Sequence, residues 1–492
     1  MFWKFRVCTG AFRHVRVRGD FRADALAAIF LALSFALPAA AQRDLPENVR
    51  SLIQQAREQT QQNKWSEAAA TYQKAVALAP RNAILWTELG AVQAKAGRFA
   101  DAISSYEQAL RVLPRSAAAE IGLAQAFRAV GNYDEARRIL ERDAREHPKD
   151  ARPLAILGDL DLEMQTYDAA IQQLTAALAL NPADTDSRNR LAMAYKSKND
   201  PTNALAQLAK ALSRDPDNAL AHYLRAGIFS DQHQDSRALP DAENAVALQP
   251  QNARARVLLA KILLRVSESA AQERAAEECS RAAAMLQPLG DIRPNDSETL
   301  FLLSRALHCA GKLEEEKKTL AAFETESQRE HSTQENQKQA NHLVDEANDR
   351  ALKNDLPGAL DLLNQALEKD PSHPGAYSLL AKLYYSAGDI DKASEAISKA
   401  IELAPYGPDA LYVQGKVFEK QGKLDEALAA FERTTLVNPR ESDAYFEMGA
   451  IYEQRNDRVR ALAAYKKALE LSPDDPDYRR ALAGLTGTSS PH

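Results

Sequence analysis

Residues 83–116 read AILWTELGAVQAKAGRFADAISSYEQALRVLPRS, and this stretch decides the fold. Apolar residues recur at helical spacing in 83–96 and again in 101–113, which predicts two amphipathic helices. The run Gly97-Arg98-Phe99 predicts a tight turn between them. Pro114 ends the second helix, because proline lacks the backbone N–H that a helix interior needs. The stretch therefore predicts a helix, a turn and a second helix.

Prolines repeat this unit along most of the chain. Two series are spaced by 34 residues: Pro80, Pro114, Pro148, Pro182, Pro216 and Pro250, then Pro371, Pro405, Pro439 and Pro473. A fixed period of this length indicates one supersecondary unit copied along the chain, and such copies stack into a solenoid. One unit buries too few large side chains to offset the entropy of ordering it, so we expect the units to fold only as a stack.

Small and large residues hold fixed positions in the unit. Gly90 and Ala102 are small where the two helices approach, and Trp86, Leu89 and Tyr106 fill the space around them. Later units keep these positions: Leu157-Gly158 and Ala170; Leu191-Ala192, Tyr195 and Ala204; Leu380-Ala381, Tyr384 and Ala393; Met448-Gly449, Tyr452 and Ala461. This pattern resembles the tetratricopeptide repeat. The resemblance implies an all-α, right-handed α-solenoid of about 12 helix–turn–helix repeats with a C-terminal capping helix.

The regular period breaks in the middle of the chain. Pro250 and Pro371 are 121 residues apart, which is 19 more than three periods. We expect a seventh unit that ends at Pro288, followed by an eighth in which Glu316 stands where the repeat has alanine. The polar run that follows has no apolar face. Two architectures stay open: two regular arrays joined by irregular repeats, or one continuous superhelix with loop insertions.

The predicted organisation follows from these marks. It comprises a signal peptide in 1–41, a linker in 42–48, six repeats in 49–252, two divergent repeats with insertions in 253–330, a polar linker or helical extension in 331–339, four repeats in 340–475, a capping helix in 476–486 and a disordered tail in 487–492.

Residues 1–41 have the pattern of a secretory signal peptide. Six basic residues precede an uncharged run from Ala25 to Ala41. Ala39-Ala40-Ala41 provides the small residues that a signal peptidase requires for cleavage. As a helix the run spans about 25 Å, short of a hydrocarbon core of about 30 Å. We predict an exported chain, periplasmic or secreted. The alternative is an anchor formed by an uncleaved N-terminal helix, which would be the only membrane contact.

Composition restricts the partners. The chain has 62 Lys and Arg against 68 Asp and Glu, a formal net charge of −6. Without the predicted signal peptide 56 basic residues face 66 acidic ones, a net charge of −10. Nucleic-acid binding needs a basic face, so we expect no nucleic-acid partner. Cys279 and Cys309 remain after cleavage; two buried free thiols are the favoured prediction, and a disulfide is the alternative in an exported protein.

Catalytic motifs are missing from the sequence. It contains no HExxH, GxSxG or GxGxxG pattern and no CxxC pair. Gly311-Lys312 and Gly422-Lys423 lack the upstream glycine of a phosphate-binding loop. We therefore predict a non-enzymatic chain with no catalytic residues, no cofactor and no bound metal.

The resemblance implies a peptide-binding groove lined by the first helix of each repeat. The candidates in the C-terminal array are Lys382, Tyr385, Tyr412, Lys416 and Phe446. The secondary candidates are Gln125, Arg128, Asn189, Met193, Lys196 and Tyr223. Aromatic rings supply contact area at low entropic cost, and lysines can pair with acidic groups. The alternative is that these aromatic rings pack between repeats.

A non-enzymatic scaffold is the function that this pattern favours. It would bind an extended or helical segment of another protein in the groove, in envelope assembly or secretion. Two alternatives remain: a self-assembling structural solenoid, and a recruiting subunit of a polysaccharide-export or other enzyme complex.

Overall fold

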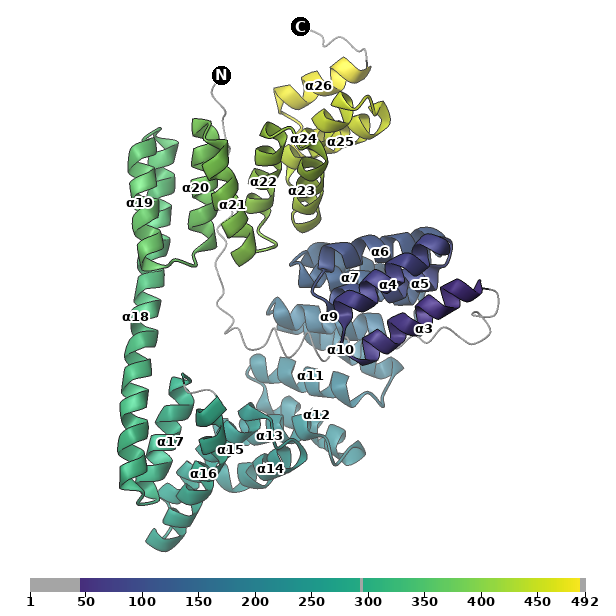
Figure 1. Cartoon of the computed structure of the whole chain (residues 1–492). Helices are drawn as coiled ribbons and strands as arrows, with labels where there is room; N and C mark the ends of the chain where they lie inside the picture. The colour runs from purple at the N-terminus through teal and green to yellow at the C-terminus, as the bar shows by residue number, and fades with distance from the viewer. Residues whose placement is uncertain (1–44, 293–294, 487–492) are drawn as a thin grey trace. The chain divides into compact units, whose positions relative to one another are not determined.

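The computed structural model describes residues 45–292 and 295–486, and within these residues every regular element is an α-helix (Figure 1). The predicted signal peptide and the predicted tail, 487–492, lie outside the described residues. None of the described helices combines the length and the apolar character needed to cross a membrane. The all-α prediction is therefore confirmed.

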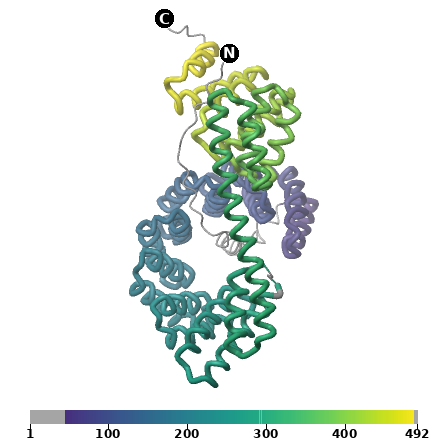
Figure 2. The backbone as a smooth tube through the Cα atoms, turned by 90° about the vertical axis from the view of Figure 1, so that its left-hand side faces the viewer, coloured from purple at the N-terminus to yellow at the C-terminus, as the bar shows by residue number. Residues whose placement is uncertain are grey.

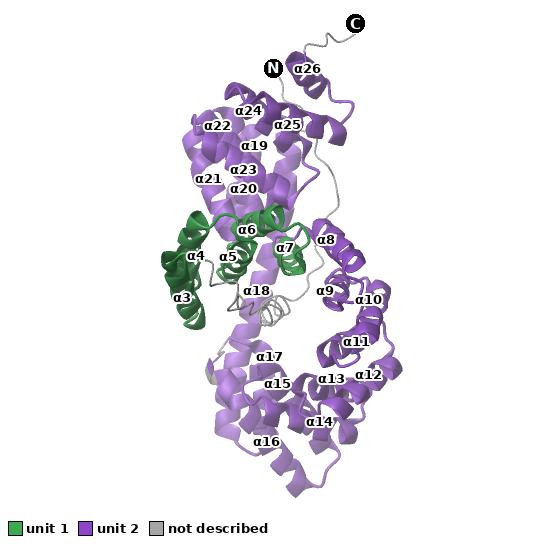
Figure 3. Cartoon of the chain, turned by 90° about the vertical axis from the view of Figure 1, so that its right-hand side faces the viewer, with its two compact units in different colours: residues 1–129 green, residues 130–492 purple. Residues whose placement is uncertain are grey.

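Two compact units make up the chain, residues 1–129 and 130–492 (Figure 3). The first contains α3 (Glu47–Gln61), α4 (Trp65–Leu78), α5 (Ala83–Lys95), α6 (Phe99–Val112) and α7 (Ala117–Ala129). This boundary falls inside the predicted first array, where the 34-residue period continues without a break.

The second unit contains the remaining helices. They are α8 (Tyr133–Glu146), α9 (Arg152–Glu163), α10 (Tyr167–Leu180), α11 (Thr185–Ser197), α12 (Pro201–Arg214), α13 (Ala219–Asp231), α14 (Asp235–Leu248), α15 (Ala253–Glu268), α16 (Gln272–Ile292), α17 (Ser297–Cys309), α18 (Leu313–Leu352), α19 (Leu356–Lys369), α20 (Pro374–Ala387), α21 (Ile390–Leu403), α22 (Pro408–Lys420), α23 (Leu424–Val437), α24 (Ser442–Gln454), α25 (Arg458–Leu471) and α26 (Pro476–Thr486). Taken in chain order, the described helices α3–α25 form twelve pairs, with α18 counted in two, which agrees with the predicted number of repeats.

A left-handed residue marks the turn inside most repeats. Positive φ angles occur at Asn63, Gly97, Gly131, Gln165, Asn199, His233, Gly311, Asn354, Gly388, Gly422 and Asn456. Glycine and asparagine predominate because they adopt this conformation at lower cost than other residues. The pair α15–α16 is the exception among the described repeats, since α15 ends at Glu268 and α16 begins at Gln272 without such a residue.

Close packing inside a repeat joins a small residue to a large one. A Cβ atom added at Gly415 would lie 2.5 Å from Cε1 of Phe431, and one added at Gly449 would lie 2.5 Å from Cε1 of Tyr465. Both rings are buried. The glycines at these positions are therefore explained by close contact with a large side chain of the second helix, which is Leu174 in the case of Gly158.

The seventh repeat differs from its prediction. The expected end at Pro288 is wrong, because α16 continues through the proline to Ile292. Leu286 and Leu289 are buried on either side of Pro288, and this packing offsets the backbone hydrogen bond that proline removes.

Cys279 and Cys309 form a disulfide with their Cα atoms 5.7 Å apart, so the favoured prediction of free thiols is also wrong. Cys279 is the eighth residue of α16, the place that Phe431 has in α23.

The helix α18 has 40 residues and belongs to two repeats (Figure 2). Its beginning packs on α17 and its end packs on α19. Residues 331–339 lie within α18, so the stretch left open as a linker or an extension is helical. Residues 328–335 are exposed, whereas Ala340 and Ala347 are buried.

Candidate protein-binding surface

The C-terminal candidates lie on three consecutive first helices of the second unit. Lys382 and Tyr385 belong to α20, Tyr412 and Lys416 to α22, and Phe446 to α24. Lys382 and Lys416 are one repeat apart, as are Tyr412 and Phe446. The 34-residue period therefore gives each pair the same position on its helix.

Tyr412 and Lys416 are engaged within the protein. They are 8% and 7% exposed, and Glu447 on α24 is 6% exposed. The Lys416 Nζ atom lies 2.9 Å from Glu447 Oε1 and 2.6 Å from Glu419 Oε2. The Tyr412 hydroxyl donates to Glu447 Oε1 at 3.4 Å. These contacts join α22 to α24. Tyr412 and Lys416 therefore hold two neighbouring repeats together on the face where the sequence predicted a peptide-binding groove.

Burial governs the acid–base behaviour of this group. It raises the pKa of Glu447 above the ordinary glutamate value, and the nearby ammonium of Lys416 offsets that rise only in part. The pKa of Tyr412 is also raised, first by burial and then by the charge of Glu447. A ligand that used these side chains would have to break a buried ion pair, which is costly.

Phe446 packs within the protein as well. Its ring stacks on Tyr478 of α26 with centroids 5.0 Å apart and lies tilted against Tyr465, 5.5 Å away. Tyr412 lies tilted against Phe431 at 5.6 Å. For Phe446 and Tyr412 the geometry is that of the alternative interpretation, in which the aromatic rings pack inside the stack.

Lys382 and Tyr385 on α20 are partly exposed, as is Phe446 on α24. Burial lowers the pKa of the Lys382 ammonium, and Asp409 opposes that shift. Burial raises the pKa of the Tyr385 hydroxyl. A partly dehydrated lysine and a tyrosine one turn apart offer a cation and a flat apolar face to a ligand.

The sequence interpretation missed the carboxylates around these residues. They are Asp409, Glu419, Glu441, Asp443 and Glu447. The pKa of Glu441 is raised by burial and then by the charges of Asp443 and Asp409, so these groups are close enough to repel one another. Asp409 and Asp443 are 34 residues apart, and that spacing could have revealed a shared acidic position.

The secondary candidates divide by burial. Gln125 and Arg128 on α7 of the first unit are buried, and so is Asn189 on α11 of the second unit. The Asn189 amide donates to Asn218 Oδ1 at 3.0 Å. These three side chains are enclosed by the protein.

Met193 and Lys196 on α11 and Tyr223 on α13 reach the surface. Lys196 Nζ lies 2.9 Å from Asp231 Oδ2, an exposed ion pair between consecutive first helices. Pairs of this kind contribute little to stability, so Lys196 can exchange its partner. Of the secondary candidates in the second unit, only Met193, Lys196 and Tyr223 are therefore accessible to a partner.

Repeated helical hairpins with first helices that carry mixed aromatic and charged positions define a helical-repeat solenoid. Tetratricopeptide-repeat models match residues 56–97, 93–160, 161–228, 351–417 and 412–476. This chain belongs to the tetratricopeptide repeat family. The matches omit 229–350, which contains the break in the proline period. Members of this family are typically non-enzymatic scaffolds. The repeats indicate a protein–protein interaction role for this chain.

No curated protein matches this chain. Among solved structures, the hetero-tetramer Cut9–Hcn1 of the APC/C has 14% identity, covers 89% of this chain and 90% of its own, and gives a TM-score of 0.36. A tetratricopeptide repeat protein from Parabacteroides merdae has 22% identity, coverages of 53% and 100%, and a TM-score of 0.40. YrrB, described as having an unusual peptide-binding site, has 23% identity, coverages of 38% and 96%, and a TM-score of 0.31. These scores are too low to transfer any partner or site to this chain.

Proposed function

We propose that this chain is an exported, non-enzymatic scaffold that binds a basic segment of another protein on the first helices α20, α22 and α24. The observation that carries the proposal is the set of carboxylates on α22 and α24, with Asp409 and Asp443 exposed. Opposite charges steer association and select partners. The rigid hairpin stack loses little entropy on binding, so several weak contacts can add along the helices.

The surface also offers apolar area from accessible side chains near the carboxylates. The stem of Lys382 supplies apolar area near Asp409, and the ring of Tyr385 supplies it near Glu419 and Glu447. A partner segment with Lys or Arg near an apolar residue fits both features. An extended segment and a helix both meet this requirement.

One charge reversal tests this surface. Asp409→Lys changes an exposed carboxylate on α22, and Asp391→Lys makes the same change on the second helix α21. The measurement is quantitative co-purification from envelope extracts with wild type and both variants. We expect Asp409→Lys to reduce recovery of the partner about tenfold, and Asp391→Lys to leave it unchanged. Equal recovery with the two variants would remove this surface from the proposal.

Export is part of the same proposal, in envelope assembly or secretion. The disulfide supports it, because structural disulfides persist in oxidising compartments outside the cytosol. The mature chain is expected to begin at Gln42, and N-terminal sequencing of the protein from the periplasm or medium checks this. A chain that stays in the cytoplasm with its N-terminus intact would refute export. A membrane-bound chain with residues 1–41 intact would indicate the anchored alternative.

A further inference from the structure

One position of the second helix is buried in every described repeat except the one that contains the beginning of α18. The eighth residue of each second helix is at most 3% exposed in eleven of the twelve described repeats. Those residues are Tyr72, Tyr106, Leu140, Leu174, Leu208, Ala242, Cys279, Leu363, Ile397, Phe431 and Tyr465. The corresponding residue of α18 is Leu320, which is partly exposed and lines a cavity. This leucine therefore lacks the cover that its equivalents have.

The usual cover is the first helix of the next repeat. In the first unit, Tyr106 of α6 packs so closely on α7 that a Cβ at Gly122 would lie 2.4 Å from its ring. In the second unit, Leu174 shares an apolar cluster with Leu191 of α11, and Leu208 shares one with Ala221 of α13. Each of these leucines is thus closed by the helix that follows in the chain.

The helix α18 cannot provide this cover for itself. It does not turn back after the eighth repeat but continues to Leu352, where its end packs on α19 as the next first helix. Among the described helices, α17 packs on α15, α16 and α18. The side of the eighth repeat that a following first helix would close is therefore left open.

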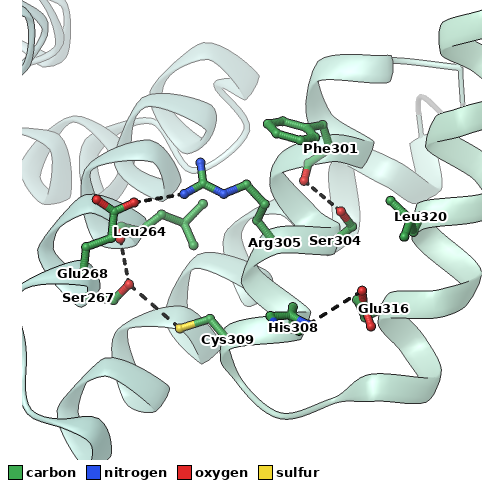
Figure 4. Close-up of a pocket in the computed structure, with 10 residues that line it drawn as sticks. All are labelled: Leu264, Ser267, Glu268, Phe301, Ser304, Arg305, His308, Cys309, Glu316 and Leu320. Carbon is green, nitrogen blue, oxygen red and sulfur yellow. Dashed lines mark hydrogen bonds and ion pairs between the residues drawn. The ribbon is translucent and has the colours of Figure 1, made fainter.

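A cavity of about 430 Å³ lies between α15, α17 and α18, and Leu320 on the open side is part of its lining (Figure 4). Its apolar wall consists of Leu264 of α15, Phe301 of α17 and Leu320 of α18. Phe301 is 42% exposed, and its ring lies 5.3 Å from that of Phe323. A large exposed ring beside a half-covered leucine is the apolar surface that a solenoid normally closes with a neighbouring helix.

A carboxylate stands beside this apolar wall. Glu316 is the fourth residue of α18, where all eleven other second helices have alanine, and its side chain is only 18% exposed. Its pairing with His308 is long, 3.7 Å, whereas Arg305 in the same cavity lies 3.0 Å from Glu268. Glu316 and Leu320 are one turn apart on the same face of α18. The cavity thus combines an apolar contact with a partly buried negative charge.

We propose that the open side of the eighth repeat binds an amphipathic helix of a partner protein, lying where the first helix of a following repeat would lie. The partner helix places an apolar side chain against Leu320 and Phe301, and a lysine or arginine next to Glu316. Helix-in-groove recognition uses the same contacts that stack one repeat on the next. This site is separate from the candidate surface on α20, α22 and α24 and does not depend on it.

A first helix of this chain is a suitable probe. A fluorescein-labelled peptide with the sequence of residues 253–268, ARARVLLAKILLRVSE, is amphipathic and has four basic residues. Fluorescence anisotropy with the full mature chain is expected to show saturable binding. Leu320→Asp and Glu316→Lys are each expected to weaken it by about tenfold or more, a difference of about 1.4 kcal/mol. The same peptide with its basic residues changed to glutamine is expected to bind about tenfold more weakly.

Val459→Asp is the matched control, since Val459 is an exposed apolar residue of α25. It is expected to leave peptide binding unchanged. Hydrogen exchange with bound peptide is expected to slow in residues 297–325. Absence of saturable binding up to millimolar peptide, or equal binding by the Leu320, Glu316 and Val459 variants, would overturn the proposal. Dimerisation in light scattering that Leu320→Asp abolishes would also overturn it, because the occupant would then be a second copy of the chain.

Discussion

The C-terminal repeats and the two irregular repeats differ in the residue at the eighth position of the second helix, and so in how that position is packed. In α23 and α25 the eighth residue is aromatic, and Phe431 and Tyr465 fill the space beside Gly415 and Gly449. In α16 the same position is Cys279, which forms a disulfide with α17. These two C-terminal repeats are thus held by the area of a buried ring, and the seventh repeat is joined to the eighth by a covalent bond.

The difference shows what the irregular region lacks. A solenoid is stabilised by packing within each repeat and between neighbours, so a weak repeat has no distant core to compensate for it. The α15–α16 pair has a small eighth residue and no left-handed residue in its turn. The next repeat has a partly exposed Leu320, and of the helices in the described part of the chain α17 packs mainly on α15, α16 and α18. The two irregular repeats are therefore where the stack depends on links other than ordinary side-chain packing.

Removing the buried ring of a regular repeat is expected to cause the largest loss of local stability. Phe431→Ala deletes a fully buried ring, and deletions of this kind cost about 3–5 kcal/mol. Leu320→Ala is the matched change at the same position of α18, and we expect about 1 kcal/mol because that leucine is partly exposed. Hydrogen exchange of α22–α23 and of α17–α18 measures each local free energy of opening, since long repeat arrays need not unfold in two states. Equal losses in the two variants would contradict the contrast.

The disulfide gives the second prediction. It links residues 30 apart, and closing a loop of this size in the unfolded chain is worth about 3–4 kcal/mol. Replacing both cysteines with alanine is therefore expected to make α16 and α17 open more readily by about this amount. The measurement is hydrogen exchange of residues 272–309 in the variant and in wild type.

Treatment of wild type with a thiol reductant is the matched control for the cysteine variant. It removes the same bond without changing the sequence, so it should reproduce the faster exchange. The helices α22 and α23 contain no cysteine and should be unaffected by either change. If the cysteine variant and wild type exchange equally in residues 272–309, then packing alone holds the seventh repeat.

The sequence predicted most of the fold because each repeat uses the same local rules. Periodic apolar residues, a turn residue and a terminal proline recur often enough that one repeat predicts the next. The prediction failed at Pro288, where buried leucines on both sides keep α16 helical. It also favoured free thiols, because the proximity of Cys279 and Cys309 depends on how α16 packs against α17. Both failures are tertiary effects that a periodic pattern does not contain.

The candidate surface was harder to predict than the fold. The period correctly places Tyr412 and Lys416 on the first helix α22, but it does not show that Glu447 on α24 binds them. A position on a helix face is a local property, whereas exposure depends on the next repeat. The same dependence explains Leu320, whose position is that of a buried residue and whose exposure follows from the length of α18.

The left-handed turns provide the smallest test of the comparison. Gly388 between α20 and α21 has φ of 83°, and a Cβ atom there would meet nothing within 4 Å. Gly388→Ala therefore changes only the backbone preference, at an expected cost of about 1–2 kcal/mol. Ser269→Ala, in the α15–α16 connection, is the matched change, and we expect less than about 0.5 kcal/mol because Ser269 is outside the left-handed region with φ of −105°. Local opening measured by hydrogen exchange should separate the two, and equal effects would show that the left-handed turn does not distinguish regular repeats from irregular ones.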